Sequence, residues 1–293
     1  MSSGVIEAGV DTWRLLFKTT RSHGDELSKL GPLTAHWMPA LSLYCIEGHP
    51  TASGLCPGDE LALRYDEVRR VLDCEPGTYE FRGLSRLDCT STYRFPDGRA
   101  GLAFLGGMAA LDWPRLKPVV WGKPPETVGL TARNSRGRLL ARGYDSGLLR
   151  GTHERGVAIR LEDQRRYPSG KRPSQDAFCA TYVRERFHSR FAPLYKSAKG
   201  VKVAGLPVLA TRIAAMLDAG ELTYREAERI GGALVIELGG AAGHYSRRTH
   251  YRRRAELREH GLVLADDFYV PVEVDMGDVL EACLDSPLWG RDG

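Results

Sequence analysis

The first pattern along the chain is an alternation of apolar and polar residues, typical of a β-strand with one buried face. Residues 9–18 show it, and we expect four of their side chains to share one side of a strand: Asp11, Trp13, Leu15 and Phe17. Residues 84–90 and 157–166 also alternate, and residues 127–144 are typical of a hairpin whose turn is residues 134–137. These patterns predict a largely antiparallel sheet.

Two segments outside these strands have apolar residues at helical spacing. The apolar stripes comprise Leu61, Tyr65, Val68 and Leu72 in residues 58–73, and Ala180, Val183, Phe187 and Phe191 in a helix that ends near Pro193. Strands and helices combined in this way indicate an α+β fold, with helices on one face of the sheet. We expect residues 1–195 to form this region.

The last third of the chain has a different character. Residues 196–205 are small and basic, which predicts a linker. We expect residues 206–293 to form a helical segment. Its helices cover residues 206–218, residues 223–238 after a capping box, and residues 247–260 before a glycine. A short turn followed by a strongly basic helix resembles the helix-turn-helix that enters a DNA major groove.

Positive charge is concentrated in that last helix. The chain has 41 Lys and Arg against 37 Asp and Glu, a net charge of +4 that is too small to indicate a nucleic-acid partner by itself. Like charges within one helix repel unless a polyanion neutralises them, so we expect residues 247–260 to bind DNA. The alternative is a solvated helix face whose arginines pair with Glu256 and Glu259.

Composition and cysteine use exclude several classes of protein. A hydrophobic content of 42% with 27% charged residues is typical of a soluble globular protein. The six cysteines show no CxxC spacing, so neither a zinc knuckle nor a disulfide framework is indicated. The amino terminus has no basic segment followed by an apolar core, so we expect a cytoplasmic protein with no membrane partner.

Two neighbouring strands carry the candidate chemistry. Arg142 and Tyr144 share one face of the first strand, and Arg160, Glu162 and Gln164 share one face of the second. Together they suit attack by a tyrosine hydroxyl on a phosphodiester, because arginines stabilise the developing charge and a carboxylate can hold a divalent metal. The alternatives are a surface tyrosine on an amphipathic strand and a cross-strand ion pair.

The order of these motifs resembles the rolling-circle replication initiators of the Rep-trans class and the filamentous-phage replication proteins of the gene II/X type. The motifs are Leu84-Ser85-Arg86-Leu87-Asp88, Thr131-Ala132-Arg133-Asn134-Ser135, Ala141-Arg142-Gly143-Tyr144-Asp145-Ser146-Gly147 and Ile159-Arg160-Leu161-Glu162. Residues 246–253 are similar to the carboxy-terminal segment of the phage type. The resemblance extends from about residue 9 to about residue 262.

The resemblance implies a replication initiator that nicks one strand at an origin. It would form a 5′-phosphotyrosine intermediate, leave a 3′-hydroxyl primer and later rejoin the strands. Asp88 and Glu162 become the expected ligands of Mg²⁺ or Mn²⁺, and Tyr144 the expected nucleophile. We expect Arg142 and Arg160 to bind phosphate oxygens.

The expected partners are double-stranded origin DNA, single-stranded DNA, and a host helicase and polymerase; a homodimer is compatible with the sequence. The expected DNA contacts are Arg133, Arg247, Arg248, Thr249, Tyr251, Arg252 and Arg253.

The chain departs from the family pattern at three places. Thr92 stands where many members have a second aspartate, residues 128–130 replace a frequent tyrosine, and Ser146 replaces a frequent lysine. Tyr167 is therefore kept as a reserve nucleophile. The alternative function is a non-catalytic DNA-binding regulator of transcription or copy number, which uses the sheet only as a scaffold.

Overall fold

The structure is a computed structural model. It describes residues 3–19, 27, 30, 33–48, 57–72, 79–111, 113–122, 126–133, 139–147, 154–238, 247–264 and 272–290. The predicted turn at residues 134–137 lies outside these residues. Within the described ranges, no helix combines the length and the apolar character that a membrane crossing requires.

The main element is an eight-stranded sheet in the order β2-β3-β1-β4-β8-β7-β6-β5. Its strands are β1 (Gly4–Thr19), β2 (Leu33–Met38), β3 (Leu43–Gly48), β4 (Tyr79–Arg94), β5 (Leu116–Trp121), β6 (Thr127–Ala132), β7 (Leu139–Asp145) and β8 (Ala158–Arg166). Every pairing in this sheet is antiparallel. The predicted α+β fold is confirmed.

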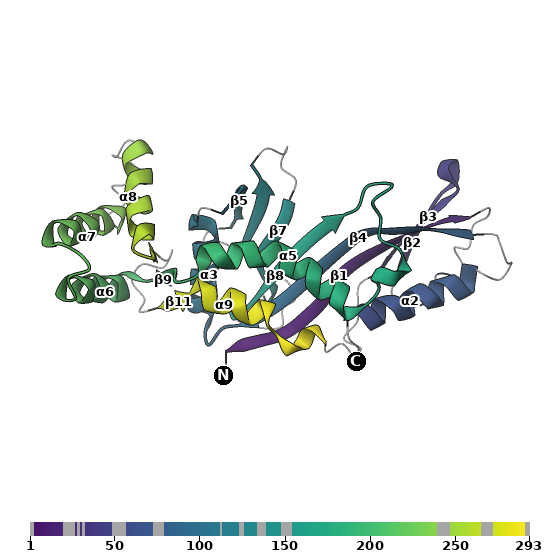
Figure 1. The fold of residues 1–293 in the computed structure, drawn as a ribbon, viewed down its shortest axis with the longest axis horizontal. Coiled ribbons are helices and arrows are strands. Elements are labelled where there is room, and N and C mark those ends of the chain that lie inside the picture. The colour runs from purple at the N-terminus through teal and green to yellow at the C-terminus, as the bar shows by residue number, and fades with distance from the viewer. Residues whose placement is uncertain are drawn as a thin grey trace.

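Helices pack on one face of this sheet (Figure 1). They are α2 (Pro57–Leu72), α3 (Gly98–Ala110), α5 (Ala180–Ala198) and α9 (Met276–Leu284); short 3₁₀ turns are η2 (Pro39–Leu41), η3 (Gln175–Ala177) and η5 (Pro287–Trp289). The predicted apolar stripes of α2 and α5 belong to the core, except Ala180, which lies at the start of α5. Strand residues Leu87 and Leu161 meet these helices in the same core.

One expectation about β1 is wrong. Trp13, Leu15 and Phe17 lie in the core as predicted, but Asp11 does not share their face. The pairing of β1 with β4 shifts between Val10 and Thr12, so Asp11 is an extra residue at a β-bulge. This irregularity sends the Asp11 side chain to Arg160, on the other face of the sheet.

The carboxy-terminal region contains the three predicted helices, α6 (Leu206–Asp218), α7 (Tyr224–Leu238) and α8 (Arg247–Glu259). Their apolar side chains form a small separate cluster, and they lie together at one end of the molecule (Figure 1). The capping box before α7 is present, because the Thr223 N–H donates to Glu226 at 2.9 Å. Gly261 ends α8 in the left-handed region, with φ +68°.

The predicted linker at residues 196–205 is wrong. Residues 196–198 are the last part of α5, and Lys202–Ala204 form β9, the central strand of a second sheet with β10 (Leu262–Leu264) and β11 (Glu273–Asp275). Strand β9 pairs in parallel with β10, across the whole helical unit. This long-range pairing cannot be read from local composition.

The end of the described chain returns to the main sheet. Helix α9 packs against α5 and β1, and its residues Val279, Leu280 and Cys283 belong to the main core. Asp275 accepts hydrogen bonds from the Gly277 and Asp278 N–H groups and so caps α9. The apolar core therefore joins residues from both sides of the predicted boundary between residues 195 and 206.

Candidate functional site

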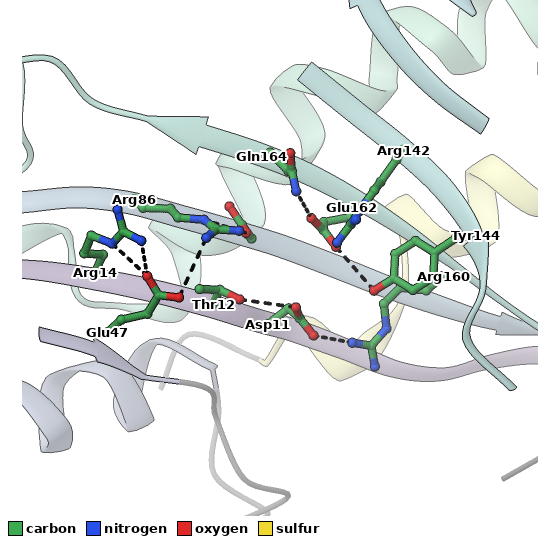
Figure 2. A network of polar contacts seen from close by, with 11 residues as sticks. Asp11, Thr12, Arg14, Glu47, Arg86, Arg142, Tyr144, Arg160, Glu162 and Gln164 are labelled. Atoms are coloured by element: carbon green, nitrogen blue, oxygen red, sulfur yellow. Dashed lines mark hydrogen bonds and ion pairs between the residues drawn. The ribbon is translucent and has the colours of Figure 1, made fainter. Parts of the chain in front are cut away.

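A row of polar side chains crosses the face of the sheet that lies opposite the helices. Residues directly opposite each other on antiparallel strands share a face, and the register pairs Arg142 with Glu162, Tyr144 with Arg160, and Asp88 with Gln164. The sequence-predicted residues of β4, β7 and β8 therefore meet on one surface. We call this surface the polar face; Figure 2 shows its side chains.

Two glycines confirm which way each face points. A Cβ added to Gly143 would lie 2.6 Å from the sulfur of Met108, which belongs to the core. A Cβ added to Gly129, which is opposite Arg142, would instead lie 2.7 Å from Cζ3 of Trp121. Successive residues of a strand point to opposite faces, so Trp121, Arg142 and Glu162 share the polar face.

Glu162 is the centre of the polar face. Its Oε2 accepts hydrogen bonds from Arg142 Nη2 at 2.8 Å and from the Tyr144 hydroxyl at 3.3 Å, and its Oε1 accepts from Gln164 Nε2 at 2.6 Å (Figure 2). The Glu162 residue is 0% exposed. A carboxylate buried to this degree requires hydrogen-bond donors, and here one donor is the hydroxyl of the candidate nucleophile.

Tyr144 is held at one face of its ring and at its hydroxyl. The guanidinium carbon of Arg142 lies 4.7 Å from the centre of the Tyr144 ring, in cation–π geometry. Burial, and next the neighbouring Glu162 carboxylate, raise the pKa of the Tyr144 hydroxyl above its ordinary value. The phenol is therefore protonated at neutral pH, and a reaction at its oxygen requires a proton acceptor.

Arg160 occupies a separate cluster beside Tyr144. It forms ion pairs with Glu7 and Asp11 of β1, and its Nε donates to the hydroxyl of Thr92 at 3.1 Å. Arg160 is only 1% exposed. A phosphate would meet this guanidinium only after displacing Glu7 or Asp11, whereas the side chain of Arg142 is 31% exposed.

Asp88 lies at the other end of the polar face. Its Oδ2 accepts from Arg86 Nε at 2.9 Å, and Arg86 also approaches Glu47, which is bound by Arg14 (Figure 2). Asp88 Oδ1 is buried and has no hydrogen-bond partner. Burial raises the pKa of Asp88 to about 7; Arg86 opposes this shift and the Glu162 charge adds to it.

The described ion pairs of the polar face join five carboxylates to four guanidiniums. The carboxylates are Glu7, Asp11, Glu47, Asp88 and Glu162; the guanidiniums are Arg14, Arg86, Arg142 and Arg160. The register places two more arginines, Arg94 and Arg166, on the same face.

The polar face fits a hard cation at one oxygen. Asp88 Oδ1 is an orphaned buried ligand atom of the type that Mg²⁺ or Mn²⁺ prefers. Both oxygens of Glu162 already accept hydrogen bonds, so Glu162 would have to release Gln164 or Arg142 to contribute. The described residues contain no group of three His, Cys, Asp or Glu side chains arranged to hold a metal ion.

The reserve nucleophile is not brought to this site. The Tyr167 hydroxyl lies 3.0 Å from that of Tyr182 on helix α5, on the side of the sheet that the helices cover. Burial, and next the hydrogen bond with Tyr182, raise the pKa of Tyr167 above its ordinary value.

The predicted DNA contacts lie in two places. Arg133 follows β6 at the sheet edge, where its Nε donates to the Leu116 carbonyl at 3.1 Å. On α8, Thr249 is half-buried and Arg252 is exposed. The side chains of Arg247, Arg248, Tyr251 and Arg253 lie outside the part of the structure that describes side chains.

Several members of the polar face were not predicted from the sequence. Glu7, Arg14 and Glu47 complete its ion pairs, and Trp121 borders it. Alternation within β1 offered a signal for Arg14, which lies between Trp13 and Leu15 and therefore faces away from the core. The partners of Glu7 and Glu47 depend on the order of strands, which no local pattern reveals.

Comparison of the chain with protein-family models, with curated proteins and with solved structures finds no match. The function is therefore inferred from the geometry of the polar face and from the residues of the chain itself.

Proposed function

We propose that this protein is a rolling-circle replication initiator, a site-specific endonuclease that cuts one DNA strand with Tyr144. The observation that carries the proposal is the hydrogen bond from the Tyr144 hydroxyl to Glu162, beside the half-exposed Arg142. A nucleophile in contact with a base, which in turn is oriented by further donors, is the arrangement that activates a weak nucleophile.

The proposed reaction is an exchange of phosphodiester bonds. The Tyr144 oxygen forms a bond to phosphorus while its proton passes to Glu162, and the bond from phosphorus to the 3′ oxygen breaks. The 3′ oxygen takes a proton from solvent and becomes the primer hydroxyl, and the 5′ phosphate stays on the tyrosine. Attack by the 3′ hydroxyl reverses the step and rejoins the strands.

Arg142 is suited to bind the reacting phosphate. It already contacts Glu162 and the Tyr144 ring, and its partial exposure leaves donors for nonbridging oxygens. A hard cation held by Asp88 Oδ1, with Glu162 as a second ligand, would add positive charge near these oxygens. Helix α8 would bind the origin duplex through its arginines, at the end of the molecule next to α3, where Arg258 Nη1 lies 3.4 Å from the Ala110 carbonyl.

The alternative is a DNA-binding regulator that uses α8 and keeps the sheet as a scaffold. One observation favours it: Asp88, Arg160 and Glu162 are each no more than 1% exposed, as buried as core leucines. Such a network could serve only to hold the strands together.

A random pool of single-stranded oligonucleotides, labelled at the 3′ end and incubated with Mg²⁺ or Mn²⁺, separates the two functions. We expect a labelled covalent adduct on denaturing gels with the wild type and at least a 1,000-fold loss with Tyr144→Phe. Tyr167→Phe is the matched control and should form the adduct normally. A wild type that binds duplex DNA but forms no adduct would support the regulator. Loss of the adduct only in Tyr167→Phe would show that Tyr167, and not Tyr144, is the nucleophile.

A further inference from the structure

The exposed side chain of Trp121 has no role in the reaction described above. Trp121 ends β5, an edge strand of the large sheet, and is 48% exposed. Large aromatic side chains are costly to expose, so an exposed tryptophan beside a candidate site is a candidate for binding. The other described tryptophans differ from it, because Trp13, Trp113 and Trp289 are each 1% exposed and Trp37 is half-buried.

The position of the indole is set by a glycine. A Cβ at Gly129 would lie 2.7 Å from Cζ3 and 2.9 Å from Cη2 of Trp121, so only a glycine lets the ring lie this close to β6. The same Cβ would lie 2.6 Å from Cδ1 of Leu139 on β7. The ring therefore packs on Gly129 of β6, close to Leu139 of β7, the strand that carries Tyr144.

The indole and the nucleophile belong to one cross-strand row. Trp121 is opposite Thr127, and Thr127 is opposite Tyr144. Adjacent strands are about 4.8 Å apart, so Trp121 and Tyr144 are about 10 Å apart at the backbone. Gly129, beneath the ring, is itself opposite Arg142.

The charges around the indole complement a nucleic acid strand. Lys117 lies four residues before Trp121 on β5, and residues at an even spacing on a strand share a face. Lys117 is exposed on this face. Arg142 provides a second cation on the Tyr144 side. Glu126, the nearest acidic residue along the chain, forms an ion pair with Arg155 at 3.0 Å.

We infer that Trp121 is a stacking platform for an unpaired base of single-stranded DNA, close to the phosphate that Tyr144 attacks. Every base has a π-face, whereas the stacked bases of a duplex have none free, so an exposed indole selects an unpaired strand. Lys117 and Arg142 would bind phosphates on either side of the stacked base. The inference rests on the proposed function for the direction of the strand, but the binding it describes can be measured without any reaction.

The test uses the full chain and a fluorescein-labelled oligothymidylate in fluorescence anisotropy. We expect Trp121→Ala to weaken binding about 5- to 100-fold, since stacking on one aromatic side chain contributes that much. Trp121→Phe should retain most of the affinity, and both variants should bind duplex DNA as the wild type does. Val120→Ala is the matched control, because Val120 is 43% exposed on the opposite face of the same strand.

A second readout is intrinsic tryptophan fluorescence. We expect unlabelled oligothymidylate to quench the wild type and to leave Trp121→Phe unquenched. Three of the other four tryptophans are buried, and Trp37 lies on β2, at the opposite edge of the sheet from β5. Unchanged affinity in Trp121→Ala, or quenching that persists in Trp121→Phe, would overturn the inference. Tighter binding of oligouridylate than of oligothymidylate would overturn the assignment to DNA.

The outcomes also separate this inference from the proposed function. Loss of affinity in Trp121→Ala, with no covalent adduct in the wild type, would uphold the stacking site and reject the tyrosine reaction. An adduct that wild type and Trp121→Ala form equally at low oligonucleotide concentration would uphold the reaction and reject the stacking site.

Discussion

Strand β8 buries side chains on both faces of the large sheet, but with opposite chemistry. On β8, Leu161 points into the apolar core under the helices, and Glu162, the next residue, points into the polar face. Burial of an apolar side chain stabilises the fold, whereas a buried charge requires partners to offset its lost hydration. The polar face contributes less to folding than the core face, and its cost is explained if the proposed reaction uses it.

A closer comparison uses two neighbouring carboxylates. Glu162 and Asp163 are both 0% exposed and both bound by arginine. Asp163 accepts from Arg165 at 2.5 Å and from Arg190 of α5 at 2.8 Å, on the helix side of the sheet. Asp163 connects the sheet to a helix, and Glu162 instead contacts a tyrosine hydroxyl.

The largest difference between the faces should appear in activity. We predict that Glu162→Gln reduces formation of the DNA adduct about 100- to 10,000-fold, because an amide cannot accept the Tyr144 proton. Single-turnover adduct formation at saturating oligonucleotide measures this effect. Asp163→Asn is the matched control: it should lower the free energy of unfolding yet form the adduct at close to the wild-type rate. Equal losses of activity in both variants would show that the network is only structural.

On the core face we expect a substitution to reduce stability but not activity. Leu161→Ala should lower the free energy of unfolding by about 2 to 5 kcal/mol, because it removes a buried side chain and leaves a cavity. Urea unfolding measures this loss. The folded fraction should form the adduct normally, since Leu161 faces away from Tyr144. A variant that remains as stable as the wild type would contradict the position of Leu161 in the core.

The smallest effect concerns the pH dependence of stability, and it comes from Asp88. Its pKa is about 7 in the folded chain, against about 3.9 when unfolded, so the folded state binds the extra proton between these values. Stability from this group is therefore full below about pH 4 and is lost as the pH rises through 7. Between pH 5 and pH 8 the loss should be about 2 to 3 kcal/mol.

Asp88→Asn should flatten this part of the profile, because asparagine has no proton to lose. Urea unfolding at a series of pH values measures it for both chains. At pH 8, Mn²⁺ should raise the Tm of the wild type more than that of Asp88→Asn, because a cation can replace the proton on Asp88. Parallel pH profiles in the two chains would show that burial does not raise the pKa of Asp88 in the folded chain.

The sequence predicted the polar face best where the strands are regular. The pairings of β8 with β4 and with β7 run without a shift, so alternation correctly grouped Arg142 with Tyr144 and Arg160 with Glu162. It failed for Asp11, where β1 has a bulge, because one extra residue reverses the face of a side chain.

Other features were beyond local patterns for related reasons. Strand β9 has three residues and pairs with strands that follow it by about 60 and 70 positions, so its small basic residues suggested a linker. Helix α3 was missed, although Asp97 before it accepts hydrogen bonds from the Arg99 and Ala100 N–H groups and offered a cap signal. Trp121 was missed because only the register shows that it shares a face with Tyr144.

The most direct test of the account is mass spectrometry of the trapped protein–oligonucleotide adduct after digestion with trypsin and nuclease. Trypsin would release Tyr144 in the peptide of residues 143–150, which contains no other tyrosine, and Tyr167 in residues 167–171. The account predicts that a nucleotide phosphate is attached to the peptide of residues 143–150. Attachment to residues 167–171, or an adduct at neither peptide, would contradict the claim that the polar face holds the nucleophile.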